Sequence, residues 1–120
     1  MPFVIARVNV PLGEAEEHSL KERFGQAIGA VPGKSEQSLM VAFEERYHLY
    51  VAGDGSQPAA YVEASVFANE GHAGYREFAA QVASAFQDVL GIDARRVYIR
   101  FSDIPVWSVA GMVVDRAQFC

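Results

Sequence analysis

The sequence predicts an α+β fold in which two βαβ units form a four-stranded sheet with both helices on one face. Two observations predict it. Apolar positions recur 58 residues apart along most of the chain, as in Val4 with Val62 and Val41 with Ile99. Within each half, the apolar spacing changes from two residues to about 3.6 and back to two, which indicates strand, helix and strand in that order. The second half therefore repeats the first.

The two pseudo-repeats are expected at about residues 2–45 and 60–103, within a single domain of residues 1–120. A chain of 120 residues is long enough for one core, and its hydrophobic fraction of 51% is typical of a globular protein. Strands joined by a helix run parallel with a right-handed crossover. Two such units side by side therefore place both helices on the same face of the sheet.

Each unit has one amphipathic helix between its two strands. The apolar stripe of the first helix consists of Leu20, Phe24, Ala27, Ile28 and Val31. The stripe of the second consists of Tyr75, Phe78, Ala79, Val82, Phe86, Val89 and Leu90. Pro32-Gly33 is expected to end the first helix and Gly91 the second, because proline cannot continue a helix and glycine is the preferred residue after one.

Two further segments are apolar yet lie outside the repeats. Residues 47–51 alternate before the turn Gly53-Asp54-Gly55 and predict a short extra strand. Residues 106–114 are too apolar for a free tail. We expect both segments to be short strands between subunits, because an open sheet face and unpaired apolar strands are covered most simply by further copies of the chain.

Composition and charge exclude several classes of protein. The net charge of −5 disfavours nucleic-acid binding, and no apolar run is long enough to span a membrane. His18, His48 and His72 lack metal-ligand spacing, so we expect no metal and no cofactor. Cys120 is the only cysteine, which excludes an intrachain disulfide and fits a reducing compartment. We expect a cytoplasmic protein that, if released, leaves the cell without a signal peptide.

The candidate site centres on Pro2. If Met1 is removed, Pro2 presents a secondary amine at a fixed position on the first strand. Lys34 lies in the turn before the second strand, and in a parallel unit that turn is at the edge where the first strand starts. Tyr98 and Arg100 are two residues apart on the last strand and so point to one face of the sheet.

These residues carry a resemblance that spans nearly the whole chain. The matching motifs are Met1-Pro2-Phe3, Asn9-Val10-Pro11, Gly33-Lys34, Met40 to Phe43, Pro58 to Ser65, Val97-Tyr98-Ile99, Asp103 and Phe119. With them the chain resembles the tautomerase superfamily, specifically its macrophage migration inhibitory factor and D-dopachrome tautomerase branch. The resemblance implies the duplicated βαβ fold, closed into a homotrimer with active sites between neighbouring subunits.

The resemblance also implies a reaction, the keto–enol tautomerisation of 2-oxo acids such as phenylpyruvate. Pro2 is then the general acid and base, with Lys34 and Tyr98 as its catalytic partners. The resemblance assigns substrate contacts to Lys34, Val66, Tyr98, Arg100 and Phe119. The chemistry agrees with this, because an apolar pocket and a neighbouring cation both disfavour a charged amine, and only a neutral amine is a base.

Two alternatives stay open at this point. Arg100 stands where the mammalian members have asparagine, and this second cation favours a sibling chemistry, namely the decarboxylation or hydrolytic dehalogenation of a small carboxylic acid by a protonated Pro2. The Trp-Gly-Trp-Asn tail of many relatives is absent, with Trp107 displaced. That change favours a cytokine-like binding protein with a vestigial pocket.

Overall fold

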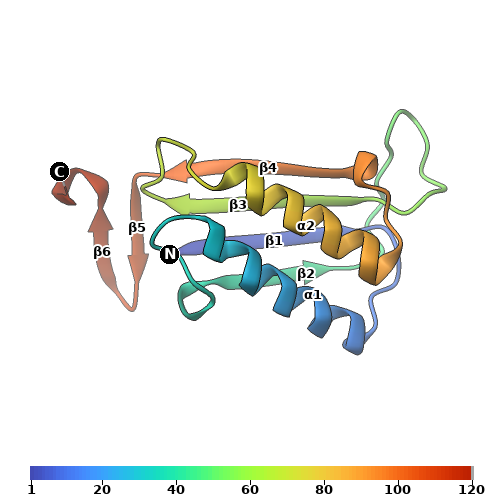
Figure 1. Ribbon diagram of the computed structural model, residues 1–120, viewed down its shortest axis with the longest axis horizontal. Coiled ribbons are helices and arrows are strands. Elements are labelled where there is room, and N and C mark those ends of the chain that lie inside the picture. Colours follow the sequence, from blue (N-terminus) through green and yellow to red (C-terminus); the bar gives the residue numbers. More distant parts are fainter. Residues whose placement is uncertain (120) are drawn as a thin grey trace.

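The computed structural model describes residues 1–119, and of Phe119 only the backbone. Its elements follow the predicted order (Figure 1). The first unit contains β1 (Pro2–Val8), α1 (Glu14–Ala27) and β2 (Met40–Glu44), and the second contains β3 (Ala60–Phe67), α2 (Tyr75–Leu90) and β4 (Val97–Ile104). A hairpin of β5 (Val106–Val109) and β6 (Met112–Asp115) follows. The α+β class with two βαβ units is confirmed.

The four long strands form one sheet in the order β2-β1-β3-β4. The strands within each unit are parallel, as predicted, with Phe3 opposite Met40 in the first and Ala60 opposite Val97 in the second. The two units meet through β1 and β3, which are antiparallel and place Pro2 opposite Val66. The helices lie side by side over one face of this sheet (Figure 1).

The core lies between the helices and the sheet. Alternate residues of β1 and β3 point toward the helices and are buried, as the period of two requires. The largest fully buried side chains are Leu20, Phe24, Ile28, Phe78, Phe86 and Ile92. Most residues of the two predicted helix stripes are buried, so the stripes face the sheet as expected.

Local hydrogen bonds and charges determine where the helices begin and end. The Gly13 N–H at the start of α1 donates to the Glu16 carboxylate at 2.9 Å, and Glu14, Glu16 and Glu17 place negative charge where the helix dipole is positive. Gly91 ends α2 in the left-handed region, and the Ile92 N–H reaches back to the Phe86 carbonyl at 3.2 Å.

One predicted boundary was wrong, and one predicted strand is not formed within the described part of the single chain. The first helix ends at Ala27, and residues 28–30 continue as a 3-10 turn that still buries Ile28 and Val31. Residues 47–50 form no strand, and only Val51 makes a bridge, to Asp54. The Tyr47 N–H instead donates to the Val8 carbonyl at 2.9 Å. Within residues 1–119 of the single chain the segment joins no ladder of the main sheet, and its role as a strand between subunits stays a prediction.

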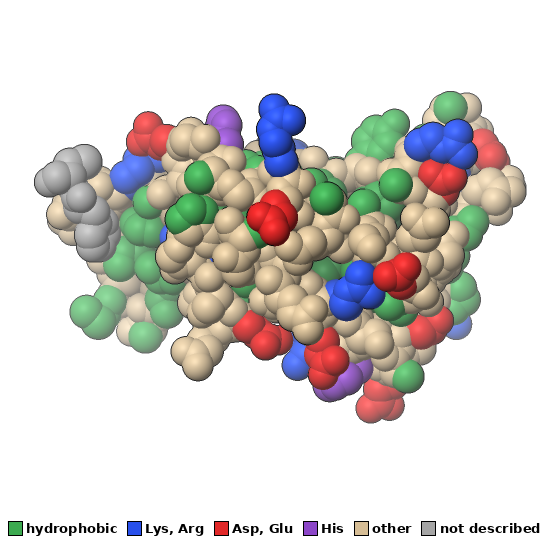
Figure 2. Space-filling model, viewed as in Figure 1, with side chains coloured by type: hydrophobic (Ala, Val, Ile, Leu, Met, Phe, Trp, Pro, Cys, Tyr) green, Lys and Arg blue, Asp and Glu red, His purple; other side chains and the backbone are tan. Residues whose placement is uncertain are grey.

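The hairpin extends beyond the sheet. Figure 1 shows it standing across the end of the sheet at which β1 begins. The radius of gyration is 14.8 Å, compared with about 13.6 Å for a compact chain of this length. Hydrophobic side chains gather over the hairpin in Figure 2, where Val106, Val109, Met112 and Val113 are exposed.

Candidate active site

The sheet has two ends that differ in chemistry. We call the end with Pro2, Val66 and Asp103 the amine end, because these three residues lie opposite one another across β1, β3 and β4. We call the other end, where β1 stops and β4 begins at Val97 and Tyr98, the tyrosine end. The predicted site residues divide between them.

The amine end brings the N-terminus and Lys34 together. Pro2 is buried as the first residue of β1, and Met1 precedes it. Burial, and then the positive charge of Lys34, lowers the pKa of the Met1 amine below its ordinary value of 8.0. The Lys34 Nζ lies 6.0 Å from the centre of the Phe67 ring. An amine at this end is therefore biased toward its neutral form.

A glycine turn brings Lys34 to this end. Gly33 has a φ of 75°, a conformation that glycine adopts without strain. The Lys34 N–H then donates to the Val31 carbonyl at 3.1 Å, which closes the turn directly after α1. Since β2 starts soon afterwards and runs parallel to β1, this turn lies where β1 starts. The sequence-based placement of Lys34 beside the N-terminus is confirmed.

A cavity of about 700 Å³ lies in front of the N-terminus. It is lined by residues 1–3, by residues 37–40 before and at the start of β2, and by residues 107–110 of the hairpin. The lining includes Trp107 and Met40, so one side is apolar and aromatic. The sequence analysis assigns neither Trp107 nor Met40 to the site. For Trp107 the available signal is the apolar segment 106–114, which predicts a strand between subunits.

Tyr98 and Arg100 lie elsewhere. Both point to the sheet face opposite the helices, where Tyr98 is 59% exposed. Tyr98 lies five residues before Asp103 on β4, which is about 16 Å at 3.3 Å per residue. A second cavity of about 230 Å³ lies there, between Tyr98, Tyr61 and the loop at 49–52. Within one chain, Tyr98 therefore does not reach Pro2.

The remaining predicted contacts are placed as follows. The side chain of Val66 is buried in the core, so only its backbone, which pairs with Pro2, faces the amine end. Arg100 lies opposite Glu63 in the sheet register and forms no ion pair with any acidic side chain of residues 1–119. The side chain of Phe119 lies outside the described part of the chain.

Two other features, a metal-binding cluster and a membrane-spanning helix, are absent from the described part of the chain. Residues 1–119 contain no group of three or more histidine, cysteine, aspartate or glutamate side chains that could hold a metal ion. No helix among them combines the length and the apolar character needed to cross a membrane.

The fold is shared with solved structures of several organisms. Leishmania major MIF2 has a TM-score of 0.87 at 24% identity, with 95% of this chain and 97% of that one covered. The macrophage migration inhibitory factor of Toxoplasma gondii has a TM-score of 0.82 at 20% identity, covering 93% and 99%. The protein Pt0534, solved after inactivation by 2-oxo-3-pentynoate, has a TM-score of 0.82 at 19% identity, covering 97% and 98%.

At these identities, the structural likeness establishes the fold alone. Comparison with curated protein sequences gave no match. The family itself comes from a sequence model, that of macrophage migration inhibitory factor (MIF), which matches residues 1–114. The chain belongs to the macrophage migration inhibitory factor family.

Proposed function

We propose that the chain is a keto–enol tautomerase of 2-oxo acids such as phenylpyruvate, with the amine of Pro2 as general acid and base once Met1 is removed. One observation carries the proposal: the N-terminal amine lies in front of a large cavity, with its pKa lowered by burial and by Lys34. An amine that is neutral near neutral pH is a base that can remove an acidic C–H proton.

The reaction would proceed as a proton transfer within the substrate. Neutral Pro2 takes a proton from the carbon beside the ketone, the C–H electron pair forms the C=C bond, and the carbonyl π pair moves to oxygen. The protonated amine then returns the proton to that oxygen, which gives the enol. Lys34 binds the substrate carboxylate and stabilises the negative charge on the enolate oxygen.

The choice of a 2-oxo acid has support from a relative. Pt0534, which shares the fold, is inactivated by 2-oxo-3-pentynoate, itself a 2-oxo acid. In the present chain, Lys34, whose charge acts on the N-terminal amine, would supply the positive charge that such a carboxylate needs. Trp107, in the cavity lining, supplies an aromatic surface for a ring such as that of phenylpyruvate.

We further propose that three copies assemble so that the tyrosine end of one copy meets the amine end of the next. The supporting observation is that Tyr98 and Pro2 lie at opposite ends of one sheet, so Tyr98 acts on a substrate held by Pro2 only if it comes from a neighbour. The exposed apolar residues of the hairpin and the exposed Tyr50 and Tyr47 fit burial in such an assembly.

Arg100 supports a second candidate function, the decarboxylation or dehalogenation of a small acid. Its guanidinium is exposed and has no acidic partner in residues 1–119, so it is available to bind a carboxylate. That chemistry needs a protonated Pro2. Burial and the charge of Lys34 lower the pKa of the Met1 amine, and the same surroundings would favour a neutral amine at Pro2 and so the tautomerase.

The test is to assay the untagged protein, with removal of Met1 verified by mass spectrometry, against phenylpyruvate and a 3-haloacrylate across pH. We expect turnover of phenylpyruvate that is lost at low pH, because the base is then protonated. Pro2→Ala retains part of the activity, since a primary amine remains. Dehalogenation that is lost at high pH would favour the sibling chemistry. Inactivity with both compounds would favour a binding protein.

A further inference from the structure

The hairpin forms one wall of the amine cavity, yet its own strands do little to fix its position there. Residues 107–110 line the cavity, while β5 and β6 form a two-stranded sheet separate from the main one. A single hairpin has little stability by itself in water. Within one chain, a contact outside the two strands is therefore needed to hold the hairpin across the end of the sheet.

Arg116, the residue after β6, makes that contact. Its Nη1 forms an ion pair with the Asp103 carboxylate on β4, and its Nε lies 2.7 Å from the carboxylate of Glu70 in the loop before α2. Its backbone N–H donates to the Pro105 carbonyl at 2.8 Å, which joins the two ends of the hairpin. One guanidinium thus connects the hairpin to β4 and to a second loop.

The acid that Arg116 contacts is itself held in place. The second oxygen of Asp103 accepts the Asn69 N–H at 2.7 Å. The side chains of Arg116 and Asp103 are only 31% and 20% exposed, whereas those of the surface pair Arg95 and Asp93 are 89% and 48% exposed. An ion pair screened from water contributes more than an exposed one, provided that its hydrogen bonds are satisfied.

This contact and the amine share one row of the sheet. Asp103 lies opposite Val66, and Val66 lies opposite Pro2. Two strand spacings, about 10 Å, therefore separate the backbone of Asp103 from that of Pro2. Any shift of Arg116 relative to Asp103 moves the hairpin wall relative to the amine, while the amine and Lys34 stay in place.

We propose that Arg116, acting through Asp103 and Glu70, is a positioning residue that holds the hairpin as a wall of the amine cavity and so sets affinity for bulky 2-oxo acids. The proposal rests on the proposed function. Arg116 does not reach the reacting atoms in this account. Its loss therefore raises KM for a substrate that needs the wall and leaves the proton-transfer step, and its pH midpoint, unchanged.

The test uses Trp107, the single tryptophan of the chain, which lies on the hairpin. Acrylamide quenching of its fluorescence reports how well the hairpin is held and requires no activity. Arg116→Gln is compared with Arg116→Lys, which keeps the charge, and with Arg95→Gln, the same change in an exposed pair at the tyrosine end. Circular dichroism establishes that each variant is folded.

We expect Arg116→Gln to raise the quenching constant about twofold and the KM for phenylpyruvate about fivefold, as loss of a charge-assisted contact implies. The kcat should stay within about twofold, and KM for pyruvate, which has no ring to meet the wall, should change less. Arg116→Lys should lie between wild type and Arg116→Gln, and Arg95→Gln should match wild type. Unchanged quenching in Arg116→Gln, or a fall in kcat at constant KM, would overturn the proposal.

Quenching also separates this proposal from the proposed function. A protein that is inactive with 2-oxo acids, but whose Arg116→Gln variant shows the expected gain in quenching, contradicts the tautomerase and supports the role of Arg116 in holding the hairpin. An active enzyme in which Arg116→Gln changes neither quenching nor KM contradicts the role of Arg116 alone.

Discussion

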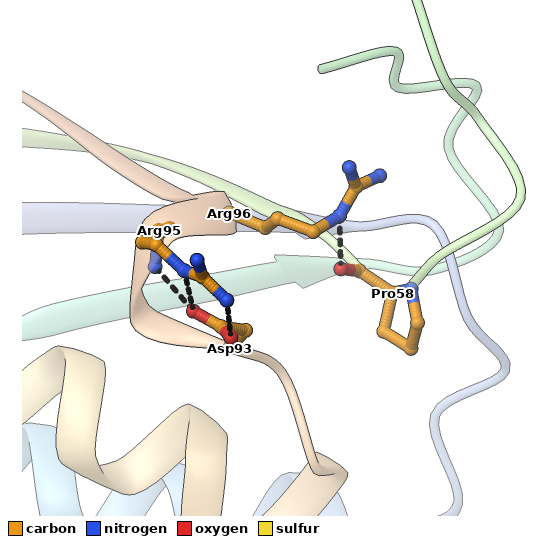
Figure 3. A network of polar contacts seen from close by, with 4 residues as sticks. All are labelled: Pro58, Asp93, Arg95 and Arg96. Carbon is orange, nitrogen blue, oxygen red and sulfur yellow. Dashed lines mark hydrogen bonds and ion pairs between the residues drawn. The ribbon is translucent and has the colours of Figure 1, made fainter. Parts of the chain in front are cut away.

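The amine end and the tyrosine end of the same sheet use positive charge in different ways. At the amine end, burial and then the positive charge of Lys34 lower the pKa of the Met1 amine. At the tyrosine end, Arg96 donates to the backbone carbonyls of Asp54, Gln57 and Pro58 at 2.9–3.0 Å. Figure 3 shows the bond to Pro58. One cation thus perturbs an ionisable group, whereas the other holds a loop against the sheet.

The causes of the pKa shifts differ in the same way. At the tyrosine end, hydrogen bonds from Arg95 lower the pKa of Asp93 to about 2, and both side chains lie on the surface. This shift stabilises a charge. At the amine end, burial is the largest cause and favours the neutral form of the amine. Only the second kind of shift makes a base, so we expect the chemistry at the amine end and substrate contacts or assembly at the tyrosine end.

The largest effect on stability is expected from a substitution that disrupts the packing at the amine end. Gly74, before α2, has a φ of 83°, and a Cβ there would overlap the Ala30 carbonyl. Gly91, at the other end of α2, has a φ of 67° with nothing within 4 Å of such a Cβ. Gly74→Ala should therefore lower the free energy of unfolding by about 3 kcal/mol or more, and Gly91→Ala by about 1–2 kcal/mol.

Urea denaturation of both variants measures the difference. Both substitutions share the cost of a left-handed backbone, so the excess in Gly74→Ala isolates the backbone contact between α2 and the segment that leads to Lys34. Equal denaturation midpoints for the two variants would contradict this account.

The sequence predicted the repeats well because their signals are local and periodic. The stripe containing Phe24 and the stripe containing Phe78 face the sheet as expected, and Gly33 turns the chain so that Lys34 reaches the N-terminus. Such features depend on residues within one unit. The same holds for Gly91, which ends α2 as predicted.

What the sequence did not predict depends on contacts between distant segments. Residues 47–50 alternate like a strand but form none within residues 1–119 of the single chain, where the Tyr47 N–H bonds to the Val8 carbonyl of β1. Trp107 lies in the lining of the amine cavity, and Arg116 meets Asp103 across 13 positions, a pairing that no local pattern encodes. The antiparallel pairing of β1 with β3 is likewise a relation between units.

The second prediction concerns the cation at the amine end. Lys34→Gln should lower kcat/KM for phenylpyruvate about tenfold or more, because a charge-assisted hydrogen bond contributes about 1.5–3 kcal/mol. It should also raise the pH midpoint of the rate, since removal of a neighbouring positive charge makes the amine easier to protonate. Lys21→Gln, on the exposed face of α1, is the matched control. An unmoved midpoint in Lys34→Gln would contradict the assignment.

The third prediction concerns the cation at the tyrosine end. Arg96→Gln removes charge-assisted hydrogen bonds to three carbonyls and should lower the free energy of unfolding by about 1 kcal/mol. Limited proteolysis should cut faster at residues 53–57, while the pH midpoint of the rate stays as in wild type. A shift of that midpoint would mean that the two ends are not separate in function.

The smallest effect is expected at Arg100. Its side chain is exposed and makes no described ion pair, so Arg100→Asn should leave stability unchanged within about 0.5 kcal/mol. Arg100→Asn should change kcat/KM for phenylpyruvate by a smaller factor than Lys34→Gln does. It should also lower the preference of the enzyme for dicarboxylates over monocarboxylates. If Arg100 proves indispensable and Lys34 dispensable, the sibling chemistry with a protonated Pro2 is the better account.

The central claim, that the free amine of Pro2 is the base, is tested most directly by comparing two samples that differ only in Met1. With Met1 retained, the Pro2 nitrogen is an amide and has no basicity. The account predicts that the sample without Met1 converts phenylpyruvate and loses its rate as the pH falls. The sample with Met1, folded alike by circular dichroism, should be slower by about a hundredfold or more, the range of general base catalysis. Full activity in a sample shown by mass spectrometry to retain Met1 would contradict it.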